Sequence, residues 1–192
     1  MKHSVPKKIV LIGASTGGPG QIQKIIESLP DLEDTTLVIG QHIVDGFMES
    51  FTKQLQSISR NTITLVKDNQ IFESSTIYIC EGETQLDSTS YRLFFTQKQS
   101  CVNSFNPDIN ILFNSFIPLC RDTEILSVIL TGIGDDGVDA CKSLSIDGAR
   151  CVTESEQSAI VDGMPNRARA VVPNIEVYNM DTIVKVISEF CE

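Results

Sequence analysis

Short apolar runs alternate with amphipathic stretches along most of the chain. Runs rich in Val, Ile and Leu are typical of buried strands, whereas apolar residues spaced three and four apart indicate helices. The apolar runs predict strands over 8–13, 35–41, 124–132 and 149–153. The amphipathic stretches predict helices over 20–29, 46–57, Pro107 to Ile117, 137–146, 165–171 and 181–190. This alternation favours a doubly wound α/β fold, in which helices flank a mainly parallel sheet.

The middle of the chain has a different pattern. Strand-like runs occur at 62–67, 75–80 and 91–96. The links between them are too short for helical crossovers, so we expect these runs to form a small antiparallel ribbon. No repeat, low-complexity stretch or linker interrupts the pattern. We therefore predict one domain over 8–192, preceded by a tail over 1–7.

Composition narrows the classes of function. The chain has 192 residues, 41% of them hydrophobic, which suits a domain with a sizeable core. A net charge of −10 would repel nucleic acid and anionic membrane surfaces. No apolar run approaches the ~18 residues that a membrane helix needs, which argues against membrane insertion. The start lacks the features of a signal peptide, so we expect a cytoplasmic protein.

The six cysteines do not suggest a metal or disulfide framework. They stand at 80, 101, 120, 141, 151 and 191, with no C-x-x-C pair among them. With only two histidines in the chain, a zinc site is not favoured. We expect the cysteines to be small buried side chains in a reducing compartment.

The first predicted strand ends in the glycine-rich turn "GASTGGPG" (13–20). A phosphate-binding P-loop would need a lysine after the last glycine, and a dinucleotide loop would need G-x-G-x-x-G; neither is present. The turn instead matches G-x-S-x-G, which exposes Ser15 where a strand turns into a helix. Ser15 is then a candidate nucleophile, with backbone N–H groups nearby for an oxyanion. The alternative is a serine that merely caps the helix.

A serine nucleophile needs a neighbouring base, and histidine is the usual one. His3 lies in the predicted tail, which leaves His42. His42 follows the second strand as Ser15 follows the first, and ligands bind at the carboxyl ends of parallel strands. The alternative is a structural histidine bonded to a backbone carbonyl.

A third strand end carries two acids, Asp135 and Asp136, among glycines. Either carboxylate could accept the second N–H of the histidine, and either could instead cap the helix predicted from Gly137. The resulting order is Ser, His, Asp. Because α/β-hydrolases have the order Ser, Asp, His, we do not expect their topology.

Taken together, these segments resemble the catalytic domain of CheB-type chemotaxis receptor protein-glutamate methylesterases. The resemblance extends from about residue 8 to 188. It is carried by "IGASTGGP" (12–19), "VIGQHIVDGFMESFTKQL" (38–55), "VILTGIGDDGVDACKSL" (128–144) and "GARCVTESEQSAIVDGMPNRA" (148–168).

The resemblance implies specific roles. The family's catalytic serine and histidine match Ser15 and His42, and its aspartate, which directly precedes a glycine, matches Asp136. Thr16 follows the nucleophile as in the family. Met164 belongs to a Gly-Met-Pro turn that lies near the site in the family.

Other positions are further candidates for the site or differ from the family's sequence. The backbone N–H groups of Gly17 and Ile133 are candidate oxyanion donors, although the family usually has methionine where this chain has Ile133. Asn110 stands where the family has aspartate, and "CEGETQL" (80–86) replaces a family Ala-Pro-Gly-x-x-His stretch. Arg167 and Arg169 are candidates for offsetting the negative charge near the site.

The resemblance also implies a function. It predicts a serine hydrolase that removes methyl groups from glutamate γ-methyl esters, with methanol as product, and that deamidates glutamines. The implied partner is the cytoplasmic domain of methyl-accepting chemotaxis receptors, with no cofactor or metal, and we expect a monomer. The family's usual N-terminal receiver domain has no counterpart in the seven residues before the first strand, as in an excised domain or a stand-alone form. A non-catalytic scaffold and an esterase for small molecules are the competing interpretations.

Overall fold

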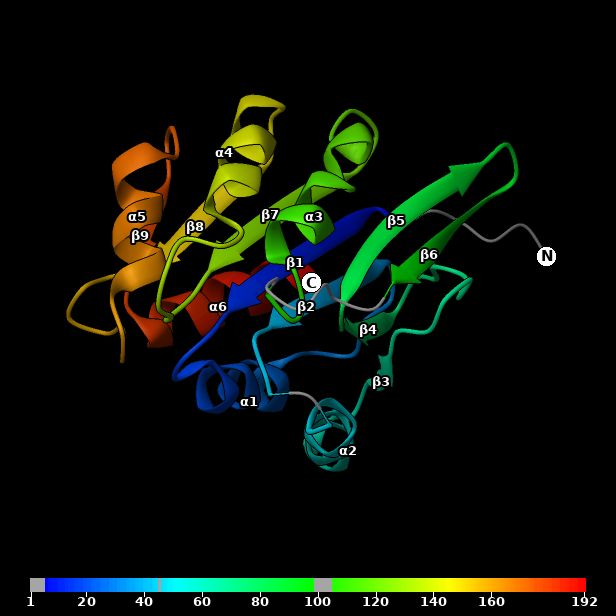
Figure 1. The fold of residues 1–192 in the computed structure, drawn as a ribbon, viewed down its shortest axis with the longest axis horizontal. Helices are drawn as coiled ribbons and strands as arrows, with labels where there is room; N and C mark the ends of the chain where they lie inside the picture. Colours follow the sequence, from blue (N-terminus) through cyan, green and yellow to red (C-terminus); the bar gives the residue numbers. More distant parts are fainter. Residues whose placement is uncertain (1–5, 45, 99–104) are drawn as a thin grey trace.

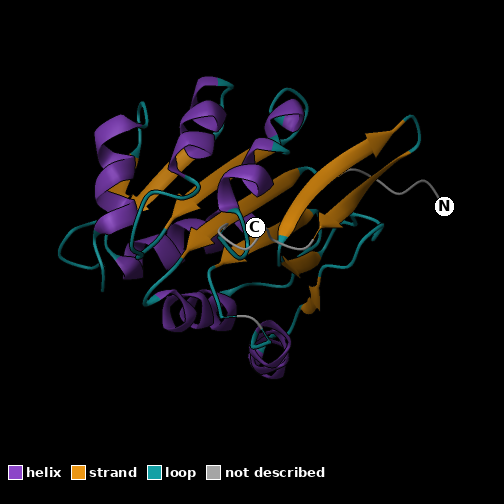
Figure 2. Ribbon diagram, viewed as in Figure 1, coloured by secondary structure: helices purple, strands orange, loops and turns teal. Residues whose placement is uncertain are grey.

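The computed structural model describes residues 6–44, 46–98 and 105–192. Its main feature is a sheet whose strands are drawn in orange in Figure 2. The sheet has seven strands in the order β3-β4-β2-β1-β7-β8-β9, and every neighbouring pair is parallel. The strands are β1 (Lys8–Ala14), β2 (Thr35–Gln41), β3 (Thr62–Leu65), β4 (Thr76–Ile79), β7 (Glu124–Ile129), β8 (Arg150–Glu154) and β9 (Glu176–Tyr178). The expected α/β class with a mainly parallel sheet is confirmed.

Helices cover both faces of this sheet (Figure 1). One face carries α1 (Gly18–Ser28), α2 (Met48–Ile58) and α6 (Met180–Cys191). The other carries α3 (Ile109–Asn114), α4 (Val138–Ile146) and α5 (Gly163–Val171). Alternate residues of β1 enter the two cores: Val10 and Ile12 face the first group of helices, whereas Ile9 and Leu11 face the second. β1 is therefore buried on both sides, which explains its uninterrupted apolar sequence.

The prediction that 62–67 and 75–80 form antiparallel ribbons is wrong. β3 pairs with β4 in parallel, and β4 pairs with β2 in parallel, so both belong to the main sheet. The ten residues 66–75 make the crossover without a helix. Their backbone is bonded instead to β6: the Phe72 N–H donates to Leu93 O at 3.0 Å, and the Phe95 N–H donates to Gln70 O at 2.8 Å. Side-chain packing of Phe72 against Phe95 completes the cover that a helix would have supplied.

An antiparallel ribbon does exist, but it consists of β5 (Glu83–Thr89) and β6 (Arg92–Lys98). The run expected at 91–96 overlaps β6, which begins one residue later. β5 was not predicted, because its sequence, "ETQLDST", is mostly polar. The ribbon stands at one side of the molecule (Figure 1), and its Leu86 and Phe95 enter the second core.

The remaining differences are small. β9 was not predicted, because three residues at a sheet edge give little periodic signal. The helix expected up to Ile117 ends at Asn114, and a short 3₁₀ turn, η1 (Ile117–Leu119), follows at Pro118. Proline lacks the N–H that a continued helix needs.

The strand order places a topological switch point between β1 and β7. From β1 the chain adds strands on one side of the sheet and then returns to β7 on the other. Crevices open at such points beyond the carboxyl ends of the strands. The loops after β1, β2 and β7, which carry the candidate residues, converge there.

The described cysteines agree with the expectation of buried thiols, with one exception. Cys80, Cys141, Cys151 and Cys191 are buried, whereas Cys120 is partly exposed, and all five are free. Burial raises the pKa of Cys191 to about 12 and that of Cys80 further still. Cys101 lies outside the described residues. Within the described part of the chain, no helix has the length and apolar character needed to cross a membrane.

Candidate active site

Ser15 stands immediately after β1, at the turn into α1. Its N–H donates to Thr131 O at 3.0 Å, and its carbonyl oxygen accepts from the Gln41 amide at 2.8 Å. The end of β2 and the loop after β7 therefore hold the backbone of this turn. Gly17, not Ser15, occupies the N-cap position of α1, so the alternative that Ser15 caps this helix is wrong.

Gly17 has a φ of 87°, in the left-handed region that glycine adopts at little cost. This conformation turns the chain sharply after Ser15. The backbone N–H groups of Thr16 and Gly17 donate to no other described residue. They are thus available to an external acceptor beside the serine hydroxyl.

His42 links the serine to a carboxylate. Its Nδ1 lies 3.2 Å from Ser15 Oγ, and its Nε2 lies 2.8 Å from Asp136 Oδ2. Because an ionised carboxylate only accepts, the second contact assigns the ring proton to Nε2, which leaves Nδ1 to accept from the hydroxyl. The imidazole is bonded to side chains and not to a backbone carbonyl, unlike the structural alternative.

Asp136 is buried, with 1% of its surface exposed. It accepts the backbone N–H of Ile109 at 2.9 Å and of Asn110 at 3.0 Å, in the first turn of α3. A carboxylate bonded by two backbone amides and the imidazole is fixed in orientation. Asp136 is therefore suited to orient His42 and to stabilise its charged form.

Asp135 is exposed, and no described hydrogen bond joins it to Ser15 or His42. Gly137 is the N-cap of α4, without a side-chain bond, so neither aspartate caps that helix. The geometry favours Asp136 over Asp135, as the resemblance implied. Asn110 accepts the Ala140 N–H at 3.0 Å, so its side chain supports α4 and is not directed at a substrate.

Asp108 is a second carboxylate beside the relay that sequence reasoning missed. It is the N-cap of α3 and accepts the Ile111 N–H at 2.7 Å. Burial raises its pKa above the ordinary value; the cap bond opposes this shift, and the charge of Asp136 adds to it. Its position directly after Pro107 and before an apolar segment is the sequence signal of an N-cap.

Gly132 brings the loop after β7 against the nucleophile. A Cβ on Gly132 would lie 2.7 Å from Ser15 Cβ and 2.3 Å from Met164 Sδ, so only glycine fits. The Met164 N–H donates to Gly132 O at 2.9 Å, and the side chain is fully buried. Met164 thus supports the turn from behind, and direct contact with a substrate is not favoured. Ile133, one residue on, is 65% exposed, and its N–H donates to no other described residue.

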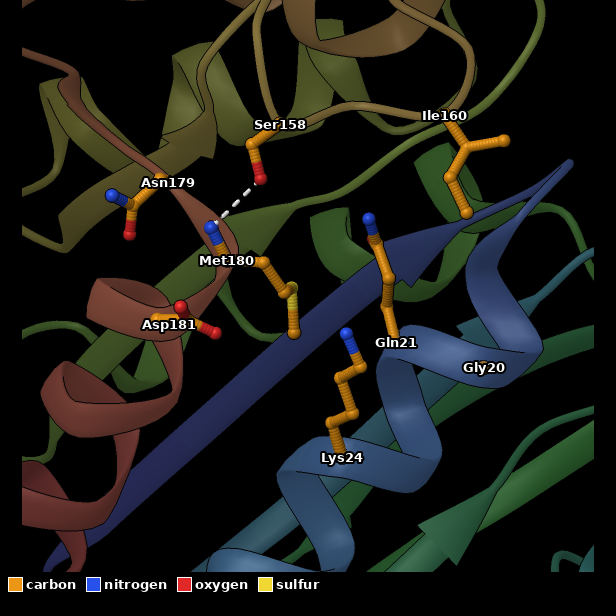
Figure 3. Close-up of a pocket in the computed structure, with 8 residues that line it drawn as sticks. All are labelled: Gly20, Gln21, Lys24, Ser158, Ile160, Asn179, Met180 and Asp181. Carbon is orange, nitrogen blue, oxygen red and sulfur yellow. Dashed lines mark hydrogen bonds between the residues drawn. The ribbon is translucent and has the colours of Figure 1, made fainter.

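A polar network braces the same turn from the other side. Glu154, buried at the end of β8, accepts from Gln21 Nε2 and Ser158 Oγ, each at 2.7 Å, and from the Thr131 N–H at 3.2 Å. Ser158 also accepts the Met180 N–H at 2.8 Å, at the start of α6. Figure 3 shows Gln21, Ser158 and Met180 among the residues that line a pocket of about 410 Å³ between α1 and α6. The strand end that carries Gly132 is therefore tied to two helices.

The two candidate arginines differ in their surroundings. Arg169 donates to Asp162 Oδ2 at 2.5 Å and to Glu154 O at 2.8 Å, so its charge is already paired. Arg167 is exposed and has no described partner. Of the two, only Arg167 can offset the negative charge toward a bound partner. His3 lies outside the described residues.

Exposed apolar side chains occur on the segments that carry the relay and next to them. The segment after His42 carries Val44 and Phe47, which are 76% and 63% exposed. Phe105, 49% exposed, stacks on the His42 ring. Ile133 follows Gly132, and Ile160, 65% exposed, packs against Gly17. We call these five side chains the apolar rim. Such clustering is typical of a surface that binds another macromolecule.

Comparison with known proteins agrees with this geometry. Residues 10–187 match the family model described as CheB methylesterase. The chain is similar to the crystal structure of the Thermotoga maritima CheB methylesterase catalytic domain, with a TM-score of 0.84 and 27% identity. That match covers 95% of this chain and 97% of the other.

Two curated relatives are named protein-glutamate methylesterase/protein-glutamine glutaminase. One, from Halalkalibacterium halodurans, is 32% identical over all of this chain and 57% of its own length. Another, numbered 2, from Carboxydothermus hydrogenoformans, is 32% identical over 84% of this chain and 47% of its own length. This chain therefore spans about half the length of these relatives. On these matches, the chain belongs to the CheB methylesterase family.

Proposed function

We propose that residues 8–192 form a catalytic domain that hydrolyses glutamate γ-methyl esters of chemoreceptors and releases methanol. The observation that carries the proposal is the relay in which His42 bridges Ser15 Oγ at 3.2 Å and Asp136 Oδ2 at 2.8 Å. The names of the relatives supply the substrate class and add deamidation of glutamine as a second reaction.

In the first half of the reaction, Ser15 Oγ attacks the ester carbonyl while His42 Nδ1 takes the hydroxyl proton. Asp136 stabilises the imidazolium through Nε2. The negative oxygen of the tetrahedral intermediate accepts from free backbone amides, for which Gly17, Thr16 and Ile133 are the candidates. Methanol leaves with the proton from His42, and an acyl-serine remains.

In the second half, His42 takes a proton from water, and the hydroxide attacks the acyl-serine carbonyl. The proton returns to Ser15 Oγ as the bond to the glutamyl group breaks. The net reaction consumes one water and gives one carboxylic acid and one methanol. A glutamine side chain follows the same steps and releases ammonia. No step needs a metal or an organic cofactor.

The surroundings of the relay support a protein substrate over a small ester. The side chains of the apolar rim are exposed, whereas the His42 side chain is only 14% exposed. An exposed apolar rim suits a side chain presented on the flank of a receptor helix, whose apolar residues would contact Phe47 and Ile133. Arg167 would face acidic groups of that receptor. On this proposal the chain acts as a monomer in the cytoplasm, where the receptor's methylated segment lies.

The test is methanol release from membranes whose chemoreceptors carry radiolabelled methyl groups. The wild-type chain should release volatile label, and Ser15→Ala should release it roughly 10³-fold more slowly or not at all. Ser155→Ala serves as a matched control, because Ser155 lies outside the relay. If the wild type binds receptors but releases nothing, it is a scaffold; if it cleaves only small soluble esters, the substrate class is wrong.

A further inference from the structure

The imidazole of His42 is held on three sides. Both of its nitrogens are hydrogen bonded, and one ring face is covered by Phe105. The centroids of the two rings lie 4.9 Å apart, and their planes differ by 2°, which is an offset parallel stack. The proposed mechanism accounts for the two nitrogens, but it gives no role to the covered face.

The backbone holds this stack in place. The N–H of Ile43, next to His42, donates to the carbonyl oxygen of Asn106, next to Phe105, at 3.2 Å. The Asn106 side chain in turn accepts the Gly82 N–H at 2.8 Å. The two stacked residues are therefore joined through adjacent backbone groups. Although Phe105 is 49% exposed, these bonds fix its backbone beside the segment that carries His42.

We propose that Phe105 is a positioning residue for the proposed esterase reaction, acting through the ring face of His42. Rotation of the imidazole would break both of its bonds, and the stack opposes that rotation. When the ring takes the serine proton, its positive charge lies over an aromatic face, which attracts cations. Both effects favour the transition state, so they act on kcat and not on substrate binding. This inference rests on the proposed function.

Three substitutions separate the contributions of the ring. Phe105→Tyr keeps the aromatic face, Phe105→Leu keeps apolar bulk without it, and Phe105→Ala removes both. We expect Tyr to retain kcat within about twofold and Leu to lower it by roughly 3- to 30-fold, the range of a cation–aromatic contact. Ala should lower kcat at least as much, with KM changed by less than about threefold in all three variants.

Substitutions of two further aromatic residues serve as controls for Phe105. Tyr91 is 93% exposed at the turn of the β5–β6 ribbon, so Tyr91→Leu should leave both constants unchanged. Phe47 belongs to the apolar rim, but no described ring contact joins it to His42. Phe47→Leu should therefore raise KM while kcat stays constant. Equal effects of Phe47→Leu and Phe105→Leu on kcat would overturn the assignment.

An NMR measurement that does not depend on enzyme activity tests the stack itself. The chain has two histidines, so in a His3→Gln background His42 gives the only imidazole signals in an NMR spectrum. The Phe105 ring should shift the His42 ring protons upfield, and Phe105→Leu should abolish that shift. An absent shift in the Phe105 protein, an undiminished kcat in Phe105→Leu, or a Tyr variant as slow as Leu overturns the proposal. A wild type that releases no methanol while the shift is present refutes the proposed function instead.

Discussion

The carboxylate of Asp136 accepts the backbone N–H of Ile109 at 2.9 Å, and this bond joins the loop after β7 to the first turn of α3. The residue that orients His42 is thus fixed by a helix that precedes it in the chain by 27 residues. Its carboxylate also accepts the Asn110 N–H. The relay depends on this helix terminus as much as on the three loops that carry its side chains.

Replacing Asp136 should affect both catalysis and stability. In Asp136→Asn the amide NH₂ must replace either Oδ2, which accepts from His42 and Ile109, or Oδ1, which accepts from Asn110, so at least one donor loses its acceptor. We expect methanol release to fall by roughly 10³- to 10⁴-fold and stability by about 1–3 kcal/mol. Asp135→Asn, at an exposed carboxylate, should change either quantity little. Equal losses in the two variants would mean that the wrong aspartate is assigned.

Gly132 should tolerate no side chain. In Gly132→Ala the new methyl group would overlap Met164 Sδ and Ser15 Cβ, and one of them must move. We expect a loss of about 1–3 kcal/mol in stability together with most of the activity. Gly20→Ala is the matched control, since a Cβ there meets nothing within 4 Å and alanine favours the helix. The control should be equally or more stable in urea unfolding, with unchanged methanol release.

Asp108 should make stability depend on pH. The pKa of its carboxyl is raised in the folded protein, chiefly by burial, so the fold favours the protonated form. Its stabilising contribution is therefore complete below the ordinary aspartate pKa and is lost as pH rises through the raised value. Asp108→Asn keeps the cap without the charge. We expect it to unfold at a higher urea concentration than the wild type at pH 7.5, with the gap shrinking toward pH 4.

Asp108→Ala provides the reference for the cap itself. It removes the acceptor of the Ile111 N–H, which should cost about 1 kcal/mol relative to Asp108→Asn at both pH values. If Asp108→Asn is less stable than the wild type at pH 7.5, the charge at this position stabilises the helix and the argument from burial is wrong.

Ser158 should matter for stability more than for chemistry. Its hydroxyl donates to Glu154 and accepts the Met180 N–H, so Ser158→Ala leaves a buried carboxylate and a helix terminus each short of one bond. We expect a loss of about 1–3 kcal/mol in thermal or urea unfolding, with methanol release reduced only mildly. A large fall in kcat with unchanged stability would instead show that the network couples directly to Ser15.

Much of the fold follows from local patterns. Strands buried on both faces, such as β1 and β7, leave unbroken apolar runs, and the helices between them carry clear periodicity. β3 and β4 were assigned to the wrong pairing because the rule that parallel strands need a helical crossover failed. Residues 66–75 satisfy their backbone groups on β6, which is distant in sequence, and no local pattern reports such a partner.

The candidate site also has residues that the sequence predicts and residues that it does not. Ser15 and His42 were identified because each follows a strand whose carboxyl end must lie at one edge of the sheet. The choice between Asp135 and Asp136 came from resemblance, since two adjacent acids look alike until α3 is placed beside one of them. Phe105, Glu154 and the close contact of Gly132 with Met164 depend on segments brought together only by the tertiary fold.

The helix-free crossover has a consequence for local unfolding. Since 66–75 exchange hydrogen bonds with β6, separating the ribbon from the crossover would expose Phe72 and Phe95 together. Amide protons of these segments should then exchange with solvent in one cooperative opening, at a lower free energy than those of β1. The nucleophile's strand and the ribbon would thus belong to separate units of local stability.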